Sequence, residues 1–350
     1  MLKNYDTLII SGGSVNGLAA LGALQFLNDQ KKLSNIKTFI GTSIGTMINY
    51  LLVIGYSPID IIAKLISEKL LEKYHKINVL NLTKGLGGFD WKHIDDFLIG
   101  LTLEKCEQPM TFKDIYDKFG LKFICSTYNM SQRKIEYLSY ESTPDLLCTA
   151  GIRMSCNLPL IFSRYRYQHN HYVDGGIVDN FSLKYVSNDN CVIAINLTSA
   201  FMYDRHTVSS NKVVQIPTSR ENSDISIPSN EDSIDTEGKE SVVTVEDTEA
   251  QRDKVEIDNA VDTDNIDVIA EGMDDLEEFD LPTYILTIIY IPLTQHIFEA
   301  IKEINSRDPN NCDILALRCK QTGWNFMMTV PEQLEIFSDG YQKTKQFFNI

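Results

Sequence analysis

The sequence contains no cysteine pair spaced C-x-x-C, and its seven cysteines are odd in number and scattered. Several lie in apolar runs, notably Cys125 and Cys191, where a free thiol behaves as a small hydrophobic residue. This argues against a disulfide framework and favours a reducing, cytoplasmic compartment. His169 and His171 form an H-x-H pair, but two ligands are too few for a metal site and no third is evident. We therefore expect no metal.

Long uninterrupted hydrophobic runs are also missing. Asp6 and Gly12 interrupt any signal-peptide-like region near residue 1. The most apolar stretch, 281–301, is broken by polar residues and prolines, namely Pro282, Pro292, Gln295, His296 and Glu299. A membrane-spanning helix rarely tolerates so many interruptions. We expect no transmembrane segment, and peripheral contact with a membrane at most.

Aromatic residues are absent from residues 204–278, where Ser, Thr, Asn and Asp dominate. Residues 221–280 carry a net charge of −19, so the remainder of the chain has a net charge of +3. Such a segment cannot bury enough apolar surface to offset the entropy of ordering it. We expect residues 204–278 to be a disordered acidic insertion of solvated chain, although a partner-binding or membrane-repelling role is open. Residues 5–200 and 281–348 then form one catalytic domain.

A serine stands in the turn Gly41-Thr42-Ser43-Ile44-Gly45, between the apolar run 38–40 and a helix-like run beginning at Met47. Small residues two places either side of a serine let neighbouring backbone pass close in a tight strand-to-helix turn. The Ser43 hydroxyl would then lie at a helix N-terminus, where negative charge is favoured. The pattern predicts the nucleophile elbow of a serine hydrolase.

A second glycine-rich turn, Ser11-Gly12-Gly13-Ser14-Val15-Asn16-Gly17, follows the buried run 7–10 and precedes a helix with leucines spaced three apart. No lysine follows Gly17, which excludes a Walker A loop, and Ser14 replaces the second glycine of a dinucleotide fingerprint. We therefore expect no nucleotide cofactor. Bare backbone N–H groups suit an oxyanion, whereas the alternative is a strand-helix turn without a ligand.

A serine hydroxyl needs a neighbouring base, and no Asp-then-His pair follows Ser43 at a convincing place. Asp174 precedes Gly175 and Gly176, and such a sequence alone is an ordinary turn signal. A carboxylate flanked by glycines can approach a serine directly, because no side chains intervene. Asp174 is therefore the candidate base.

These three motifs, in this order, resemble the patatin-like phospholipases, whose pattern is a glycine-rich oxyanion loop, a G-x-S-x-G elbow and a D-G-[GA] aspartate. Two more segments are similar, 149–162 with its small residues, proline and phenylalanine, and the glycine-tyrosine helix around Gly340. The resemblance covers residues 5–200 and 281–348. It departs at Ser14, the family's third glycine, and at Asn16, where Lys or Arg is usual.

The resemblance implies a Ser43–Asp174 dyad without histidine, an oxyanion hole from the N–H groups of Gly12, Gly13 and Ser14, and an additional donor at Ile44. It implies an acyl-enzyme mechanism that needs no cofactor, with a phospholipid or lysophospholipid as substrate at a membrane surface and no nucleic-acid partner. Two alternatives are open: a nonspecific carboxylesterase or acyltransferase on the same scaffold, and a catalytically impaired lipid-binding or scaffold protein. The sequence does not identify protein partners of the acidic insertion.

The alternation of short buried runs and helical runs predicts an α/β fold with three α/β/α layers and a mostly parallel central sheet. Such sheets place their sites at the carboxyl ends of the strands, where both glycine loops fall. Strands are expected at 7–10, 38–41, 122–127, 134–138, 191–197 and 313–318. Helices are expected at 17–30, 44–54, 58–72, 92–101, 145–151, 284–304 and 332–347.

Overall fold

The computed structural model describes residues 3–74, 87–187, 189–199, 311–319 and 326–350. The chain divides into two compact units, one formed by residues 1–216 with 284–350 and the other by residues 217–283. The second unit lies outside the described residues, as do the acidic insertion expected at 204–278 and the helix expected at 284–304.

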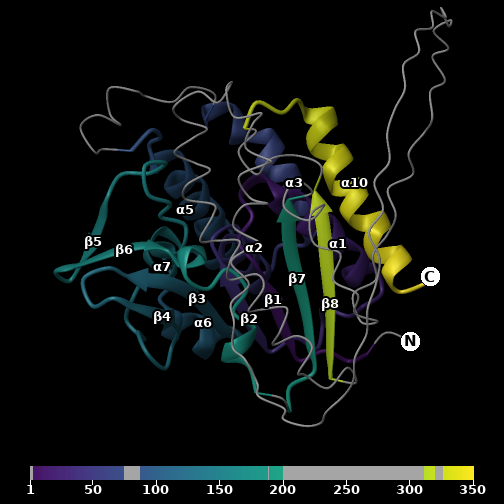
Figure 1. Ribbon diagram of the computed structural model, residues 1–350, viewed down its shortest axis with the longest axis horizontal. Coiled ribbons are helices and arrows are strands. Elements are labelled where there is room, and N and C mark those ends of the chain that lie inside the picture. Colours follow the sequence, from purple (N-terminus) through teal and green to yellow (C-terminus); the bar gives the residue numbers. More distant parts are fainter. Residues whose placement is uncertain (1–2, 75–86, 188, 200–310, 320–325) are drawn as a thin grey trace, which may run out of the picture. The chain divides into compact units, whose positions relative to one another are not determined.

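An eight-stranded sheet forms the centre of the first unit, in the order β5-β6-β3-β2-β1-β7-β8, with β4 paired to β3 (Figure 1). The parallel strands are β1 (Thr7–Ile10), β2 (Thr38–Thr42), β3 (Lys122–Asn129), β7 (Val192–Ser199) and β8 (Cys312–Cys319). The antiparallel strands are β4 (Lys134–Leu138), β5 (Tyr165–Tyr167) and β6 (Asn170–Asp174). The predicted mostly parallel sheet is confirmed.

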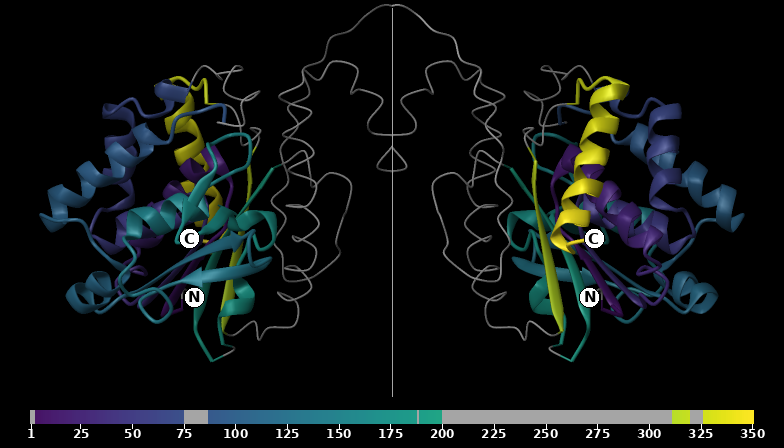
Figure 2. Two further views of the ribbon diagram at one scale, coloured as in Figure 1. Left: turned by 90° about the vertical axis from the view of Figure 1, so that its left-hand side faces the viewer. Right: turned by 90° about the vertical axis from the view of Figure 1, so that its right-hand side faces the viewer.

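The described helices gather on one face of the sheet (Figure 2). They are α1 (Gly17–Asp29), α2 (Ile44–Val53), α3 (Pro58–Ser67), α5 (Lys92–Cys106), α6 (Phe112–Phe119), α7 (Cys148–Ser155) and α10 (Val330–Phe347). Successive side chains of each strand point to opposite faces of the sheet, as a pleated backbone requires. Leu8 and Ile10 join the apolar cluster of the helices, whereas Ile9 packs on the other face against Phe181 and Leu183. That second face is covered, within the described residues, by the segment around the short helix η4 (Leu183–Tyr185).

Most of the expected elements are present with bounds shifted by one or two residues. The helix expected at 58–72 ends at Ser67, because Lys69 adopts a left-handed φ of 50° that no helix continues through. The helix expected at 145–151 instead begins at Cys148 and continues to Ser155, and the helix expected at 92–101 continues to Cys106. The prediction missed α6, β5 and β6. Of these three, β6 carries the candidate base, because it ends at Asp174.

The helices α1 and α10 join sequence segments more than 300 residues apart through glycine contacts. A Cβ added to Gly22 of α1 would lie 1.8 Å from the carbonyl oxygen of Phe337, and one added to Gly340 of α10 would lie 2.0 Å from that of Ala19. The Tyr341 hydroxyl donates to Asp29 Oδ2 at 3.0 Å across the same crossing. The close approach explains the glycine of the glycine-tyrosine helix.

Replacing Gly340 with alanine should therefore destabilise the fold, because neither helix backbone can yield to the new methyl group. We expect Gly340→Ala to lower the free energy of unfolding by about 1–3 kcal/mol. The matched control is Gly100→Ala in α5, where a Cβ would meet no atom within 4 Å. That variant should gain about 0.5–1 kcal/mol from helix propensity. Urea unfolding of both variants checks the pair, and equal effects would contradict the glycine contact.

Candidate active site

Ser43 occupies a tight turn between β2 and α2, as its motif predicts. Its φ of 52° and ψ of −124° place a non-glycine residue in the left-handed region, a conformation that costs about 1–3 kcal/mol and occurs often at functional sites. A Cβ on Gly41 would lie 2.4 Å from the Thr46 nitrogen, and one on Gly45 would lie 2.2 Å from the Ile10 carbonyl oxygen. Both glycines are therefore required by close backbone approach, and Ser43 is presented at the N-terminus of α2.

The strand β3 places Asp174 beside the elbow. Along one edge, β3 pairs with β2 up to Ser126, which lies opposite Thr42, and β4 occupies the other edge. From Thr127 onward the first edge is free for β6, so Thr127 lies opposite Asp174. Thr42 and Asp174 thus occupy consecutive positions along the same edge of one strand. Ser43, which directly follows Thr42, is brought next to Asp174.

Asp174 is buried, with an exposed fraction of 1%. Its Oδ1 accepts a hydrogen bond from the Gly176 N–H at 2.8 Å. Burial raises the pKa of Asp174 from its usual value to about 7, and it outweighs the lowering by the Ser43 hydroxyl and the Gly176 N–H. The carboxyl group is therefore poised to exchange a proton near neutral pH.

The Ser43 hydroxyl lies close enough to lower both the pKa of the Asp174 carboxyl group and the pKa of the Cys156 thiol. Asp174 Oδ2 is buried and has no hydrogen-bond partner among the described residues. The Ser43 hydroxyl is thus near the carboxyl group without a completed hydrogen bond to Oδ2. Burial raises the pKa of Cys156 well above its usual value, so this thiol stays neutral beside Ser43.

The glycine loop lies over the elbow. A Cβ on Gly12 would lie 3.2 Å from the Ser43 Cβ and 2.4 Å from Asn180 Oδ1. The Gly12 N–H donates to the Asn180 carbonyl oxygen at 3.2 Å, so this expected oxyanion donor is already engaged. By contrast, no acceptor within the described part of the chain takes the N–H of Gly13 or Ser14. These two donors begin the short helix η1 (Ser14–Asn16).

The two departures from the family pattern have different structural consequences. Ser14 has a φ of 51°, a left-handed conformation that glycine adopts at no steric cost, which explains the family's glycine there. Ser14 holds the same turn and keeps its N–H. Asn16 is buried, and its Oδ1 has no hydrogen-bond partner in the residues described. A neutral amide thus stands where the family pattern carries a cation.

The remaining motif residues pack the turns together. Ile44, the first residue of α2, packs against Gly17, where a Cβ would lie 2.5 Å from Ile44 Cγ1. The Thr42 hydroxyl is 2.6 Å from Ser126 Oγ, which fixes the end of β2 to β3. Gly175 passes the same serine closely, with its ideal Cβ 2.6 Å from the Ser126 carbonyl oxygen.

Two residues of the site were not singled out from the sequence. Ser155 Oγ accepts a hydrogen bond from the Ser43 N–H at 3.0 Å, and the Asn157 carbonyl oxygen accepts one from the Asp174 N–H at 3.0 Å. Both lie in the segment 149–162 that resembles the family, but their roles depend on contacts distant in sequence. A serine and an asparagine among small apolar residues were the signals available.

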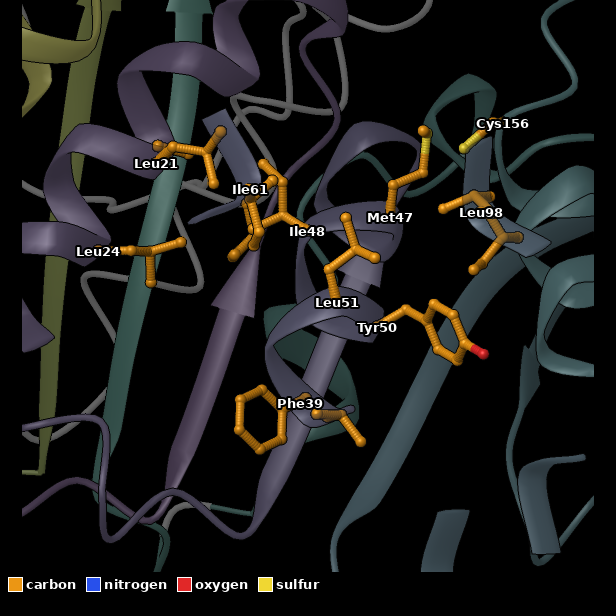
Figure 3. Packing of buried hydrophobic residues seen from close by; sticks show 14 of the residues in the cluster. Leu21, Leu24, Phe39, Met47, Ile48, Tyr50, Leu51, Ile61, Leu98 and Cys156 are labelled. Atoms are coloured by element: carbon orange, nitrogen blue, oxygen red, sulfur yellow. The ribbon is translucent and has the colours of Figure 1, made fainter. Parts of the chain in front are cut away.

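A cavity of about 120 Å³ opens beside Ser43. Apart from Ser14, Ser43 and Tyr74, its lining is almost entirely apolar and comes from α1, α2, α3, α5 and the loop 158–162. Figure 3 shows Leu21 of α1, Ile48 and Leu51 of α2 and Ile61 of α3 turned toward one another in this region. Such a lining suits a hydrocarbon chain rather than a polar ligand.

The described histidines lie outside this geometry. His171 is exposed on β6, and His169 lies in the turn before it with a φ of 70°. The described ranges contain no group of three or more His, Cys, Asp or Glu residues that could hold a metal ion. Across the same ranges, no single helix is long and apolar enough to cross a membrane, and α2 with α3 meet that threshold only as a pair bent by 114°.

Comparison with known proteins identifies relatives in sequence. A family model described as patatin-like phospholipase matches residues 8–186. The "Probable lipid hydrolase 463L" of Invertebrate iridescent virus 6 is 34% identical over 193 residues, covering 52% of this chain and 63% of that protein. The "Uncharacterized protein R571" of Acanthamoeba polyphaga mimivirus is 28% identical over 192 residues, covering 53% and 63%. The chain thus spans less than two thirds of the length of these curated relatives.

Solved structures show more distant likeness. VipD from Legionella pneumophila is 15% identical, with 99% of this chain and 67% of that chain covered and a TM-score of 0.48. Full-length ExoU of Pseudomonas aeruginosa, solved with SpcU, is 14% identical, with 59% and 45% covered and a TM-score of 0.33.

Proposed function

Because the chain belongs to the patatin-like phospholipase family, we propose that it is a serine acyl hydrolase that cleaves fatty-acyl esters of lipids through Ser43 and Asp174. The observation that carries the proposal is the pairing along β3, which brings a serine in a strained elbow next to a buried carboxyl group. The pKa of about 7 at Asp174 supports it, because a general base works best when its pKa lies near the working pH.

In the proposed reaction, ionised Asp174 accepts the Ser43 hydroxyl proton while Ser43 Oγ attacks the ester carbonyl carbon. The tetrahedral intermediate collapses when the C–O bond to the alcohol breaks, and Asp174 returns its proton to the departing alkoxide. Asp174 then takes a proton from water, whose oxygen attacks the acyl-enzyme. Asp174 gives that proton to Ser43 Oγ as the bond between Oγ and the acyl carbon breaks, and the fatty acid is released.

We assign the oxyanion to the N–H groups of Gly13 and Ser14, together with that of Ile44 at the N-terminus of α2. The positive end of the helix dipole adds to this stabilisation. Gly12 supplies the space beside Ser43, and its N–H joins the hole only after leaving Asn180. One such donor is worth about 100- to 1,000-fold in rate.

The substrate class follows from the apolar cavity beside Ser43. An acyl chain in this cavity places its ester carbonyl at the polar end, near Ser14 and Ser43. We propose a glycerophospholipid or lysophospholipid, taken up at a membrane or micelle surface. We also propose a reducing, cytoplasmic compartment, since seven scattered cysteines do not suit a disulfide framework.

Covalent labelling tests the dyad. A fluorophosphonate probe should label wild-type protein at Ser43, and Ser43→Ala and Asp174→Asn should each lower phospholipid hydrolysis by at least about 1,000-fold. The double variant should be little worse than either single one, because the two residues act as a unit. His171→Ala is the control and should retain activity. If His171→Ala lost activity while Asp174→Asn kept it, the base assignment would be wrong.

The pH dependence follows from the state of Asp174. Only the ionised carboxylate accepts a proton, so kcat/KM should rise with pH and level off above a pKa of about 7. At one pH unit below that value, activity should be about a tenth of its plateau. Circular dichroism at each pH excludes unfolding as the cause. A profile flat from pH 5 to pH 8 would contradict a buried carboxylate base.

Filling the cavity should select against long acyl chains. Leu51→Trp places extra volume between α1 and α2, and each excluded methylene removes about 0.8 kcal/mol of binding. Exclusion of two or three methylenes predicts a fall in kcat/KM of about 15- to 60-fold for long-chain esters. A butyrate ester is the internal control and should be hydrolysed at the wild-type rate. Equal loss on both esters would argue for general damage, and no loss on either for an acyl site elsewhere.

A further inference from the structure

The end of α7 contacts both halves of the proposed dyad. The segment Arg153–Asn157 carries Ser155 and Asn157, which are two residues apart. It lies where the elbow after β2 and the end of β6 come together, and its polar side chains are buried. Neither residue is assigned a role by the proposed mechanism.

Ser155 holds the elbow. Its Oγ accepts the hydrogen bond from the Ser43 N–H at 3.0 Å and lies 2.9 Å from Thr46 Oγ1. Ser43 is the strained residue of the turn, so a hydrogen bond to its backbone opposes relaxation toward an ordinary conformation. Ser155 thereby fixes the position from which the Ser43 hydroxyl projects.

Asn157 holds the end of β6. Its carbonyl oxygen accepts the Asp174 N–H at 3.0 Å, and its Nδ2 donates to the Tyr172 carbonyl oxygen at 2.6 Å. These two bonds flank Val173 and fix the backbone that carries the Asp174 side chain. The remaining polar atom of the side chain, Oδ1, accepts from Arg153 Nη1 at 2.7 Å.

Arg153 orients the Asn157 amide. Because a guanidinium can only donate, it holds Oδ1 toward itself and therefore directs Nδ2 toward Tyr172. Its charged group is buried among aromatic rings, 4.6 Å from the Trp91 ring and 5.5 Å from the Phe162 ring, and its Nη2 donates to the Ser163 carbonyl oxygen at 2.8 Å. Burial lowers the pKa of Arg153 to about 10, which leaves it charged at neutral pH.

We propose that Ser155 and Asn157 are positioning residues that together set the distance between the Ser43 hydroxyl and the Asp174 carboxyl group. The proposal rests on the proposed dyad function. It assigns them no contact with substrate, so they act on the chemical step and not on substrate binding.

Ser155→Ala and Asn157→Ala should each lower kcat about 10- to 100-fold, because a displacement of about 1 Å at reacting groups has an effect of this size. KM should stay within about twofold of wild type, since neither side chain is in the apolar cavity. The rate of fluorophosphonate labelling at Ser43 should fall in parallel with kcat.

Asn129→Ala is the matched control. Asn129 is also a fully buried asparagine, and its Nδ2 contacts Glu136 and the Tyr172 hydroxyl rather than the Tyr172 carbonyl. It should lower thermal stability by an amount similar to Asn157→Ala while leaving kcat near wild type. A kcat loss equal to that of Asn157→Ala would show a general structural effect and overturn the proposal.

Amide hydrogen exchange gives a readout independent of activity. Ser155→Ala removes the acceptor of the Ser43 amide and should speed its exchange at least about tenfold. Asn157→Ala keeps the backbone carbonyl that accepts the Asp174 N–H but removes the Nδ2 bond to the Tyr172 carbonyl, so the loosened end of β6 should speed exchange at the Asp174 amide by a smaller factor. Asn129→Ala should change neither amide. If the wild type is labelled at Ser43 but both variants match its kcat and exchange rates, the positioning role is wrong and the proposed function stands. If the wild type is neither labelled nor active, the proposed function fails. Unchanged amide exchange in both variants would then overturn the positioning role as well.

Discussion

One edge of β3 is shared by two strands of opposite direction, and the candidate site depends on this arrangement. β2 ends at Thr42, opposite Ser126, and β6 ends at Asp174, opposite the next residue, Thr127. A shift of one residue in either pairing would turn the alternate side chains to the other face of the sheet. The hydroxyl contact between Thr42 and Ser126 and the close passage of Gly175 along Ser126 oppose such a shift. The parallel core therefore supplies a rigid frame for two groups that come from segments about 130 residues apart.

The same frame removes Asp174 from water, and this has a cost in stability. An ionised carboxylate in an apolar site needs compensating hydrogen bonds, and at Asp174 the Gly176 N–H and the Ser43 hydroxyl only partly offset the loss of solvation. The result is a carboxyl group with its pKa near 7 and a buried oxygen without a completed hydrogen bond. Together with the strained φ of Ser43, this is the kind of local conflict that structures retain at functional sites.

The sequence was sufficient to predict the features that depend on short-range chemistry. Gly41, Gly45 and Ser43 define the elbow, because the close approach of backbone there is local to one turn and its neighbouring strand. The five parallel strands were visible as short buried runs. The hairpin β5–β6 was not, because its residues Tyr165–Asp174 mix aromatic, charged and polar types without clear alternation. α6 was also missed, although Thr111 and Asp114 form a capping box at its start.

The contacts of Ser155, Asn157 and Gly12 could not be predicted, because each depends on a partner that only the fold brings near. Ser155 meets Ser43 across 112 positions, and the Gly12 N–H meets the Asn180 carbonyl oxygen. The Gly12 contact also limits the consequence of Ser14. With Gly12 engaged, the proposed oxyanion hole depends on the N–H groups of Gly13, Ser14 and Ile44. The backbone of Ser14 keeps the left-handed conformation that glycine would have. Since backbone N–H groups are the donors, the serine side chain removes none of them. Asn16 is different, because a neutral side chain cannot replace the field of a cation. In the proposed mechanism, a loss of oxyanion stabilisation is therefore expected to come from position 16.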